Sequence, residues 1–197
     1  MKRLNICIDI DGTITNPYDW IGLANKYFNT SIEPYNVTEY EIDKVLGVTR
    51  EEYLEFYDKF GEMIHLNATV RDNANEKLKE LSKRHNLYYV TAREKRMTEV
   101  TYKWLRMNEF PMDSVFLLGS HYKVDKAKEL NCDVFIEDRY ENAIQLALAG
   151  FKVLLVDCYY NRLPVIPGIT RVFNWNEIYN EIKKLEIRKE EAIQEIA

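Results

Sequence analysis

The stretch Ile6–Asn16 (ICIDIDGTITN) most constrains what this chain can fold into. An apolar run that begins at Leu4 ends in Asp9 and Asp11, which flank one isoleucine and are followed at once by glycine and threonine. Such a run is typical of a strand in the middle of a parallel sheet. Carboxylates this close repel each other, and a buried one without a counter-charge takes up a proton. Because Mg²⁺ takes oxygen ligands of this kind, the stretch predicts the floor of a metal-dependent site.

The composition of the chain is typical of a soluble globular protein, and its length suits one domain, or one domain carrying a smaller insertion. The chain has 197 residues, of which 46% are hydrophobic and 30% charged. Its net charge of −5 gives no electrostatic reason to expect binding to a nucleic-acid polymer or a membrane. Three cysteines without metal-ligand spacing, and no long N-terminal apolar segment, predict free thiols in the cytoplasm. They are Cys7, Cys132 and Cys158.

The segment after the first strand has helical spacing and no strand signal. Apolar residues predict helices over 18–29, 37–46 and 49–64. Thr49 has the side chain of an N-cap, and Gly47 suits the C-terminal end of the helix before it. We therefore predict that residues 16–68 form a small helical insertion, and that residues 1–15 and 69–197 together form the rest of the fold.

From Arg71 onward, helical and strand patterns alternate. Helices are predicted over residues 74–85, 94–108, 124–131, 142–149 and from 175 on, and strands over 87–91, 114–118, 133–137 and 152–156. Alternation of this kind indicates right-handed β-α-β units and a doubly wound parallel sheet, which is an α/β fold.

Polar side chains follow several of these strands, and ligands of such sheets bind outside the carboxyl ends of the strands. Asp9 and Asp11 follow the first strand, and Glu137 and Asp138 close another. The strand over 87–91 adds a hydroxyl and a cation, Thr91 and Arg93. Acids, a hydroxyl and a cation at one edge are what phosphate chemistry with Mg²⁺ needs.

In these motifs the sequence resembles the haloacid dehalogenase (HAD) superfamily of phosphohydrolases. Asp9-Ile10-Asp11-Gly12-Thr13 matches the first family motif, Thr91 in YVTAR the second, and Glu137-Asp138 in VFIED the fourth. The third motif is a lysine near the start of the helix before the fourth. The branch that it resembles is that of the 5′(3′)-deoxyribonucleotidases and similar bacterial proteins. The resemblance implies a Rossmann-like core with residues 16–68 as a helical cap.

The resemblance also implies roles for single residues. Asp9 would be the nucleophile that forms an aspartyl-phosphate, and Asp11 the general acid and base. Mg²⁺ would be held by Asp9, by the backbone carbonyl of Asp11 and by Asp138. The phosphate would be bound by the Thr91 hydroxyl, the Ala92 backbone N–H, Lys123 and Arg93.

Several assignments stay open at this point. The usual fourth motif is Asp-Asp, so Glu137 could hold a metal-bound water or orient the lysine. Lys123 is preferred over Lys126 as the motif lysine because it opens its helix. Thr91 could instead cap the next helix, and Arg93 could lie on the surface.

Aromatic residues of the insertion could stack on a base or sugar, or could form the insertion's own core. They are Trp20, Phe28, Tyr40, Tyr57 and Phe60. We assign no role to the histidines His65, His85 and His121. Asn161-Arg162 is either a substrate loop or a turn.

The leading hypothesis is a Mg²⁺-dependent phosphomonoesterase that acts on nucleoside monophosphates. One alternative is a phosphatase or phosphomutase for a sugar phosphate or another small metabolite. Another is a catalytically silent protein that binds phosphate and metal. The expected partner is thus a small phosphorylated molecule, and the sequence leaves the oligomeric state open, a homo-oligomer included.

Overall fold

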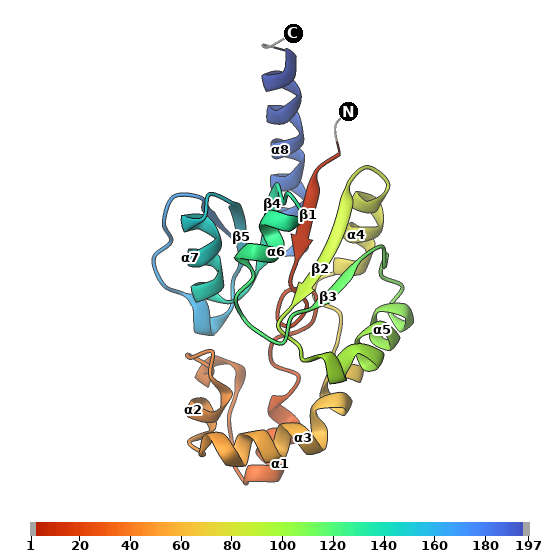
Figure 1. The fold of residues 1–197 in the computed structure, drawn as a ribbon. Helices are drawn as coiled ribbons and strands as arrows, with labels where there is room; N and C mark the ends of the chain where they lie inside the picture. Colours follow the sequence, from red (N-terminus) through yellow and green to blue (C-terminus); the bar gives the residue numbers. More distant parts are fainter. Residues whose placement is uncertain (1–2, 195–197) are drawn as a thin grey trace.

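The computed structural model describes residues 3–194, which contain a six-stranded parallel sheet of order β3-β2-β1-β4-β5-β6 (Figure 1). The strands are β1 Asn5–Ile8, β2 Asn86–Thr91, β3 Val115–Leu117, β4 Val134–Glu137, β5 Lys152–Val156 and β6 Ile169–Val172. The predicted α/β fold with a parallel sheet is confirmed. The edge strand β6 was not predicted, because its four residues follow a loop without a helix of their own.

Strand β1 lies at the centre of the sheet and is buried on both faces. Ile6 pairs with Leu87 of β2 on one side and with Val134 of β4 on the other. Its side chains alternate, so Ile6 and Ile8 belong to one apolar cluster and Cys7 to the other. The near-continuous apolar run of the sequence is thus explained by burial on two faces.

Helices cover both faces of the sheet (Figure 1). The helices of this part are α4 Ala74–Ser82, α5 Thr98–Met107, α6 Val124–Glu129, α7 Tyr140–Leu148 and α8 Trp175–Gln194. Buried side chains of α4, α5 and α8 pack on one face of the sheet, and those of α6 and α7 pack on the other. At the start of α8, the indole N–H of Trp175 donates to the carbonyl of Thr13 at 3.1 Å. The last helix therefore supports the loop that follows β1.

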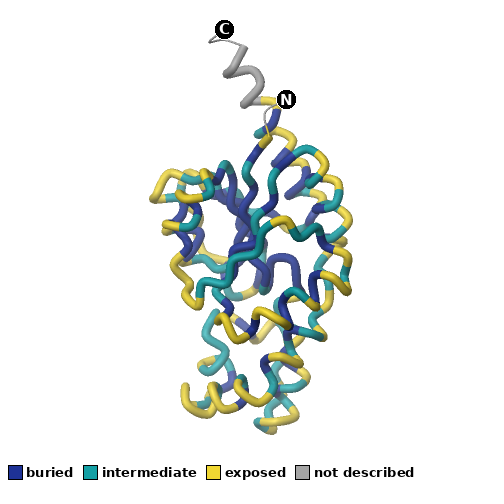
Figure 2. Tube along the Cα trace, turned by 45° about the vertical axis from the view of Figure 1, so that its right-hand side comes forward, coloured by how far each residue is buried: buried dark blue, intermediate teal, exposed yellow. Residues whose placement is uncertain are grey.

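The helical segment of the sequence contains α1 Ile21–Phe28, α2 Ile42–Leu46 and α3 Arg50–Leu66. These helices share an apolar cluster of their own around Phe56, whereas their outer surface is exposed (Figure 2). Thr49 caps α3 as predicted, in a capping box with Glu52, and Gly47 ends α2 with φ +68°. The predicted helix over 37–46 is too long, because only its second half is helical; Pro34–Asn36 form a 3₁₀ turn.

The helical segment is connected to the sheet by two chain crossings that lie side by side. Thr15 and Val70 form an antiparallel bridge, and the Asn16 N–H donates to the Thr69 carbonyl at 2.9 Å. This paired connection lies directly after the Asp-x-Asp motif. The division into residues 16–68 and the remainder stays a prediction.

One further boundary differs from the sequence prediction. The helix expected to begin at Glu94 starts with a 3₁₀ turn, Lys95–Met97, and α5 itself begins at Thr98. Within residues 3–194, we find no helix with the length and apolar composition needed to cross a lipid bilayer.

Candidate active site

Three acids converge where β1 and β4 end. Asp9 directly follows β1, Glu137 is the last residue of β4, and Asp138 follows it. Because β1 and β4 are hydrogen-bonded neighbours, carboxylate oxygens of the three side chains lie within 4.8 Å of one another. All three residues are buried. The sequence prediction that these acids share one edge of the sheet therefore holds in the structure.

Lys123, at the N-terminus of α6, lies among these acids. Its Nζ is 2.5 Å from Asp9 Oδ1 and 2.9 Å from Glu137 Oε2. Burial alone would lower the pKa of Lys123, but the two carboxylates raise it above its usual value, so the ammonium stays charged. The other candidate, Lys126, pairs instead with Glu129 at the surface. The structure thus brings Lys123 to the acids and leaves Lys126 away from them.

Glu137 is bonded on both of its oxygens. Oε2 accepts from Lys123, and Oε1 accepts from Asn142 Nδ2 at 2.9 Å. Of the two roles left open for Glu137, this arrangement corresponds to orienting the lysine.

Asp138 is held by a hydroxyl on each oxygen. Thr13 Oγ1 donates to Oδ1 at 3.3 Å, and the hydroxyl of Tyr160 donates to Oδ2. Burial and the neighbouring Glu137 raise the pKa of Asp138 to about 6. Tyr160 was missed in the sequence, because it lies in the loop after β5 and no motif marks it. Its neighbour Asn161 is buried and donates to the carbonyl of Asp138 at 2.6 Å, so it has a structural role.

Gly12 is required where it stands, between the acids and Tyr160. Its φ is +78°, and a Cβ at this position would lie 2.3 Å from Asp138 Oδ2 and 2.7 Å from the Tyr160 hydroxyl. Only a residue without a side chain fits both the backbone conformation and the space.

The cluster carries more negative than positive charge. Burial raises the pKa of Asp9 well above its usual range, and the carboxylates of Glu137, Asp138 and Asp11 add to this, although Lys123 opposes it. A divalent cation bound by oxygen ligands would remove this repulsion. Asp9 and Asp138, together with the backbone carbonyl of Asp11, fit such an ion by their chemistry.

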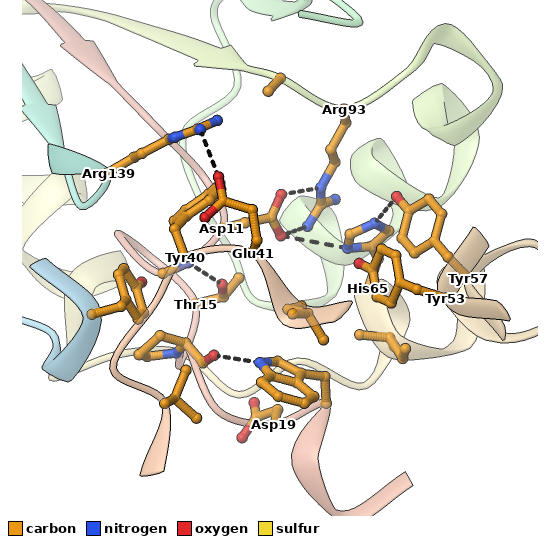
Figure 3. Close-up of a pocket in the computed structure, with 18 of the residues that line it drawn as sticks. Asp11, Thr15, Asp19, Tyr40, Glu41, Tyr53, Tyr57, His65, Arg93 and Arg139 are labelled. Carbon is orange, nitrogen blue, oxygen red and sulfur yellow. Dashed lines mark hydrogen bonds and ion pairs between the residues drawn. The ribbon is translucent and has the colours of Figure 1, made fainter. Parts of the chain in front are cut away.

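Asp11 is not one of the three clustered acids, and it lines a cavity in which Arg93 and His65 lie beside its carboxylate (Figure 3). Arg93 binds its carboxylate with two nitrogens, Nε to Oδ2 at 2.8 Å and Nη2 to Oδ1 at 2.7 Å. Nδ1 of His65 lies 3.4 Å from Oδ1. Burial would raise the pKa of Asp11, but Arg93 and His65 outweigh it and hold the pKa well below its usual range.

The last residue of β2 and the segment after it contain the other predicted phosphate ligands. Thr91 is buried, and its hydroxyl accepts from the Arg93 N–H at 3.2 Å. It is not a helix N-cap, because α5 begins seven residues later. Arg93 is 4% exposed, so the surface alternative is wrong; its guanidinium points to Asp11. Ala92 lines the cavity.

The cavity has a volume of about 530 Å³ and lies between the strand ends and the helical segment. Of the aromatic residues named from the sequence, Trp20, Tyr40 and Tyr57 line it, while Phe28 and Phe60 pack in the cluster of the helical segment. Further aromatic residues of the lining are Tyr53, Phe56 and Tyr160. His65, to which the sequence assigned no role, lies on the cavity wall.

The arginines that line the cavity are each paired with a carboxylate. Arg93 pairs with Asp11, and Arg139 Nη2 lies 3.4 Å from Glu41 Oε1 (Figure 3). Arg50 Nη1 lies 3.3 Å from an oxygen of Asp43. Arg139 also lies over the ring of Tyr40, 4.3 Å from its centroid.

A comparison with protein families matches almost the whole chain. Residues 3–189 match the family described as "5′ nucleotidase, deoxy (Pyrimidine), cytosolic type C protein". A nucleotidase of Clostridium acetobutylicum is 51% identical over 193 residues, which cover 98% of this chain and 100% of that protein.

Solved structures share the fold at lower identity. A HAD family hydrolase from Deinococcus radiodurans, with bound phosphate and sodium, superposes with a TM-score of 0.66 at 15% identity, over 93% of this chain and 96% of that one. The YfnB protein of Bacillus subtilis, bound to magnesium, superposes with a TM-score of 0.63 at 18% identity, over 92% of this chain and 100% of that one.

Proposed function

Because the chain belongs to the cytosolic type C 5′-nucleotidase family of HAD-like phosphatases, we propose that it hydrolyses nucleoside monophosphates through an aspartyl-phosphate, with Mg²⁺ as cofactor. The observation that carries this proposal is the position of Asp9. Its carboxylate lies with Lys123 and Asp138 at the strand ends, next to a cavity large enough for a small molecule.

In the proposed reaction, an oxygen of Asp9 attacks the phosphorus, and the bond from phosphorus to the ester oxygen breaks. Asp11 passes a proton to the departing oxygen, and later takes one from the water that hydrolyses the aspartyl-phosphate. Lys123 and the Thr91 hydroxyl stabilise charge on the phosphoryl oxygens. A bound Mg²⁺, held by Asp9, Asp138 and the Asp11 carbonyl, would neutralise charge between nucleophile and phosphate.

The proton for the first step needs a source, because Arg93 favours the ionised form of Asp11. A phosphate monoester has a second pKa near 6, so its monoanion can bring that proton into the cavity. Asp11 would then relay it to the ester oxygen.

The charges of the cavity support a monophosphate over a di- or triphosphate. The lining arginines already have carboxylate partners, and Asp19, Glu41 and Asp43 lie on the same wall. A second phosphate there would meet acids rather than free cations. A neutral leaving group such as a nucleoside fits better, and the tyrosines of the lining offer faces for a base.

We further propose that residues 16–68 act as the lid of this cavity. The paired crossing at Thr15 and Val70 would be its hinge, because it connects the lid to the loop that carries Asp11. The buried free thiols support work in a reducing compartment, and we propose the cytoplasm.

The proposal is tested with a panel of phosphorylated metabolites in the presence of Mg²⁺ or of EDTA. We expect phosphate release from nucleoside monophosphates that requires Mg²⁺ and is abolished in Asp9→Asn. Asp11→Asn should slow formation and breakdown of the aspartyl-phosphate without preventing its formation. Faster release from sugar phosphates would favour the metabolite phosphatase, and phosphate binding without any release would favour the silent binding protein.

A further inference from the structure

The carboxylate of Asp11 is held by groups that are far from it in the sequence. The Arg93 side chain supplies a two-point contact, and its remaining nitrogen, Nη1, donates to Thr101 Oγ1 at 2.9 Å. Thr101 in turn donates to the carbonyl of Met97 at 2.7 Å. The guanidinium is thus fixed at both ends, by Asp11 in the cavity and by the first turns of α5 behind it.

His65 approaches the same carboxylate from the helical segment (Figure 3). It is 7% exposed, and its Nδ1 lies 3.4 Å from Asp11 Oδ1. Its Nε2 lies 2.8 Å from the hydroxyl of Tyr57, eight residues earlier on the same face of α3. Both ring nitrogens of His65 therefore have partners, and these partners set the orientation of the ring.

Close packing fixes the part of α3 that carries His65. Gly61 is buried, and a Cβ on it would lie 3.0 Å from the Tyr57 ring and 3.1 Å from the methyl carbon of Met97. A side chain here would push the Tyr57 ring and the Met97 methyl aside by a few tenths of an ångström, so glycine favours the close approach of α3 to Met97, in front of α5. The contact of His65 with Asp11 thus depends on how α3 packs at this junction, whereas the contact of Arg93 with Asp11 involves no residue of α3.

We infer that Arg93 and His65 are positioning residues for Asp11. They hold its carboxylate at one place on the cavity floor, where the ester oxygen of the substrate arrives. Since His65 belongs to α3, Asp11 is held from both sides only while the helical segment is docked. This inference rests on the proposed function of Asp11 as general acid and base.

The competing role for Arg93 is direct binding of the phosphate. The geometry favours positioning, because all three guanidinium nitrogens are already bonded to protein oxygens. The two roles differ in how they respond to the leaving group. Loss of a phosphate ligand slows every substrate, whereas a misplaced general acid slows only substrates whose leaving oxygen must be protonated.

The test compares single turnovers of a nucleoside 5′-monophosphate and of p-nitrophenyl phosphate. In both, a bond from Asp9 to phosphorus forms and the ester bond breaks; the nucleoside oxygen must gain a proton, whereas p-nitrophenolate leaves as a stable anion. For Arg93→Met we expect release of the nucleoside to slow about 100-fold, the low end for general acid catalysis, and release of nitrophenolate to slow less than about threefold.

Two variants change the support of these residues instead. Thr101→Val removes the hydroxyl that accepts from Arg93, behind the cavity lining, and Tyr57→Phe removes the hydroxyl on His65 Nε2 but keeps the ring that lines the cavity. Each should show the same selective loss at about tenfold, and KM of Thr101→Val should stay unchanged within about twofold. Arg93→Lys keeps the positive charge but not the two-point contact of the planar guanidinium. Its rate of nucleoside release should lie between those of wild type and Arg93→Met. Met63→Ala, which changes an exposed side chain of α3, serves as the control and should behave as wild type.

An equal loss for both substrates, or a raised KM without the split, would overturn the inference and assign Arg93 to the phosphate. If Arg93→Met does not fold, Thr101→Val and Tyr57→Phe decide the question by the same split. Absence of turnover in the wild-type protein with every substrate would instead overturn the proposed function, so the two failures are distinguishable.

Discussion

The acid cluster at the strand ends with Lys123, here called the floor, and the residues of the helical segment that line the cavity, here called the wall, are positioned by different kinds of contact. On the floor, Asp9, Lys123 and Asp138 are at most 5% exposed, follow strands or open a helix, and are bonded to side chains of other elements. On the wall, Tyr40, Tyr53 and their neighbours come from the helical segment, are partly exposed and make mostly ring contacts. The groups proposed for the chemistry are thus positioned by the sheet, whereas those proposed to face the rest of the substrate are positioned by the helical segment through ring contacts.

The largest change that we expect is a fall in kcat for Lys123→Met, at the floor. This substitution removes the only cation bonded to Asp9 in the part of the chain that the structure describes, and leaves Asp9 and Glu137 facing each other. We expect kcat for nucleoside monophosphates to fall by about 10³-fold or more, as for loss of a main electrostatic contact. Lys126→Met is the matched control, because its surface pair with Glu129 contributes about 0.5 kcal/mol or less. If the two variants exchanged behaviour, Lys126 would be the motif lysine.

Gly12→Ala tests whether the floor tolerates any added atom. The added Cβ meets Asp138 and Tyr160 and also needs a positive φ, so we expect a loss of about 3 kcal/mol in the free energy of unfolding. Urea titrations measure this loss. Gly22→Ala is the control, since Gly22 lies in α1 with nothing near its Cβ position and should gain up to about 1 kcal/mol. Equal stabilities of the two variants would contradict the distinction between floor and wall.

Asp138→Asn tests whether the floor carries excess negative charge. The pKa of Asp138 rises from 3.8 to about 6 on folding, so the folded protein binds more protons than the unfolded chain between these values. Without divalent cations, the stability contributed by this group is therefore greatest below pH 4 and is lost as the pH rises to 6. In EDTA above pH 6 we expect Asp138→Asn to be more stable than wild type by about 2 kcal/mol.

The measurement is urea unfolding between pH 4 and pH 7. Added Mg²⁺ should raise the stability of the wild-type protein and have little effect on Asp138→Asn. A variant that is less stable than wild type in EDTA at pH 7 would show that Asp138 contributes to the fold by its charge, contrary to this account.

The smallest changes, in stability and in KM, are expected for Glu41→Gln, at the wall. The pair of Glu41 with Arg139 connects the helical segment to the residue after Asp138, but Glu41 is 40% exposed at its side chain. We expect a loss of about 0.5 kcal/mol in stability and a change of KM within about threefold. Glu39→Gln, whose partner Lys44 lies within the helical segment, is the control. A large fall in kcat in Glu41→Gln would place this pair among the groups that govern the chemistry.

The floor could be predicted from the sequence, and the wall largely could not. Asp9, Glu137 and Asp138 each follow an apolar strand, and the carboxyl ends of parallel strands share an edge, so their proximity follows from local patterns. Lys123 was preferred over Lys126 by the same reasoning about a helix start. The metal-binding and catalytic roles of these residues stay predictions.

The contacts of Arg93, His65 and Tyr160 depend on where separate elements pack, and no short pattern encodes that. Arg93 has no partner near it in sequence that would distinguish a phosphate ligand from a residue bonded to Asp11. His65 reaches Asp11 from α3, whose close packing is favoured by Gly61. Likewise, strand β6 pairs only with β5 at the edge of the sheet, and no α-helix separates the two in sequence, so the alternation of strands and helices does not mark it.

The central place of β1 has a consequence for the synthesis of the chain. Of the six strands described, this one is synthesised before the others, and its partner Val134 in β4 follows Ile6 by about 130 residues. At 5–20 residues per second, roughly 6 to 26 s pass before both neighbours of β1 are available. Its other neighbour, β2, pairs Leu87 with Ile6 and is synthesised only after the whole helical segment, so β1 has no partner strand at a stage when α1 to α3 can already pack around Phe56. The order of synthesis therefore favours a helical segment that folds before the strand from which it departs.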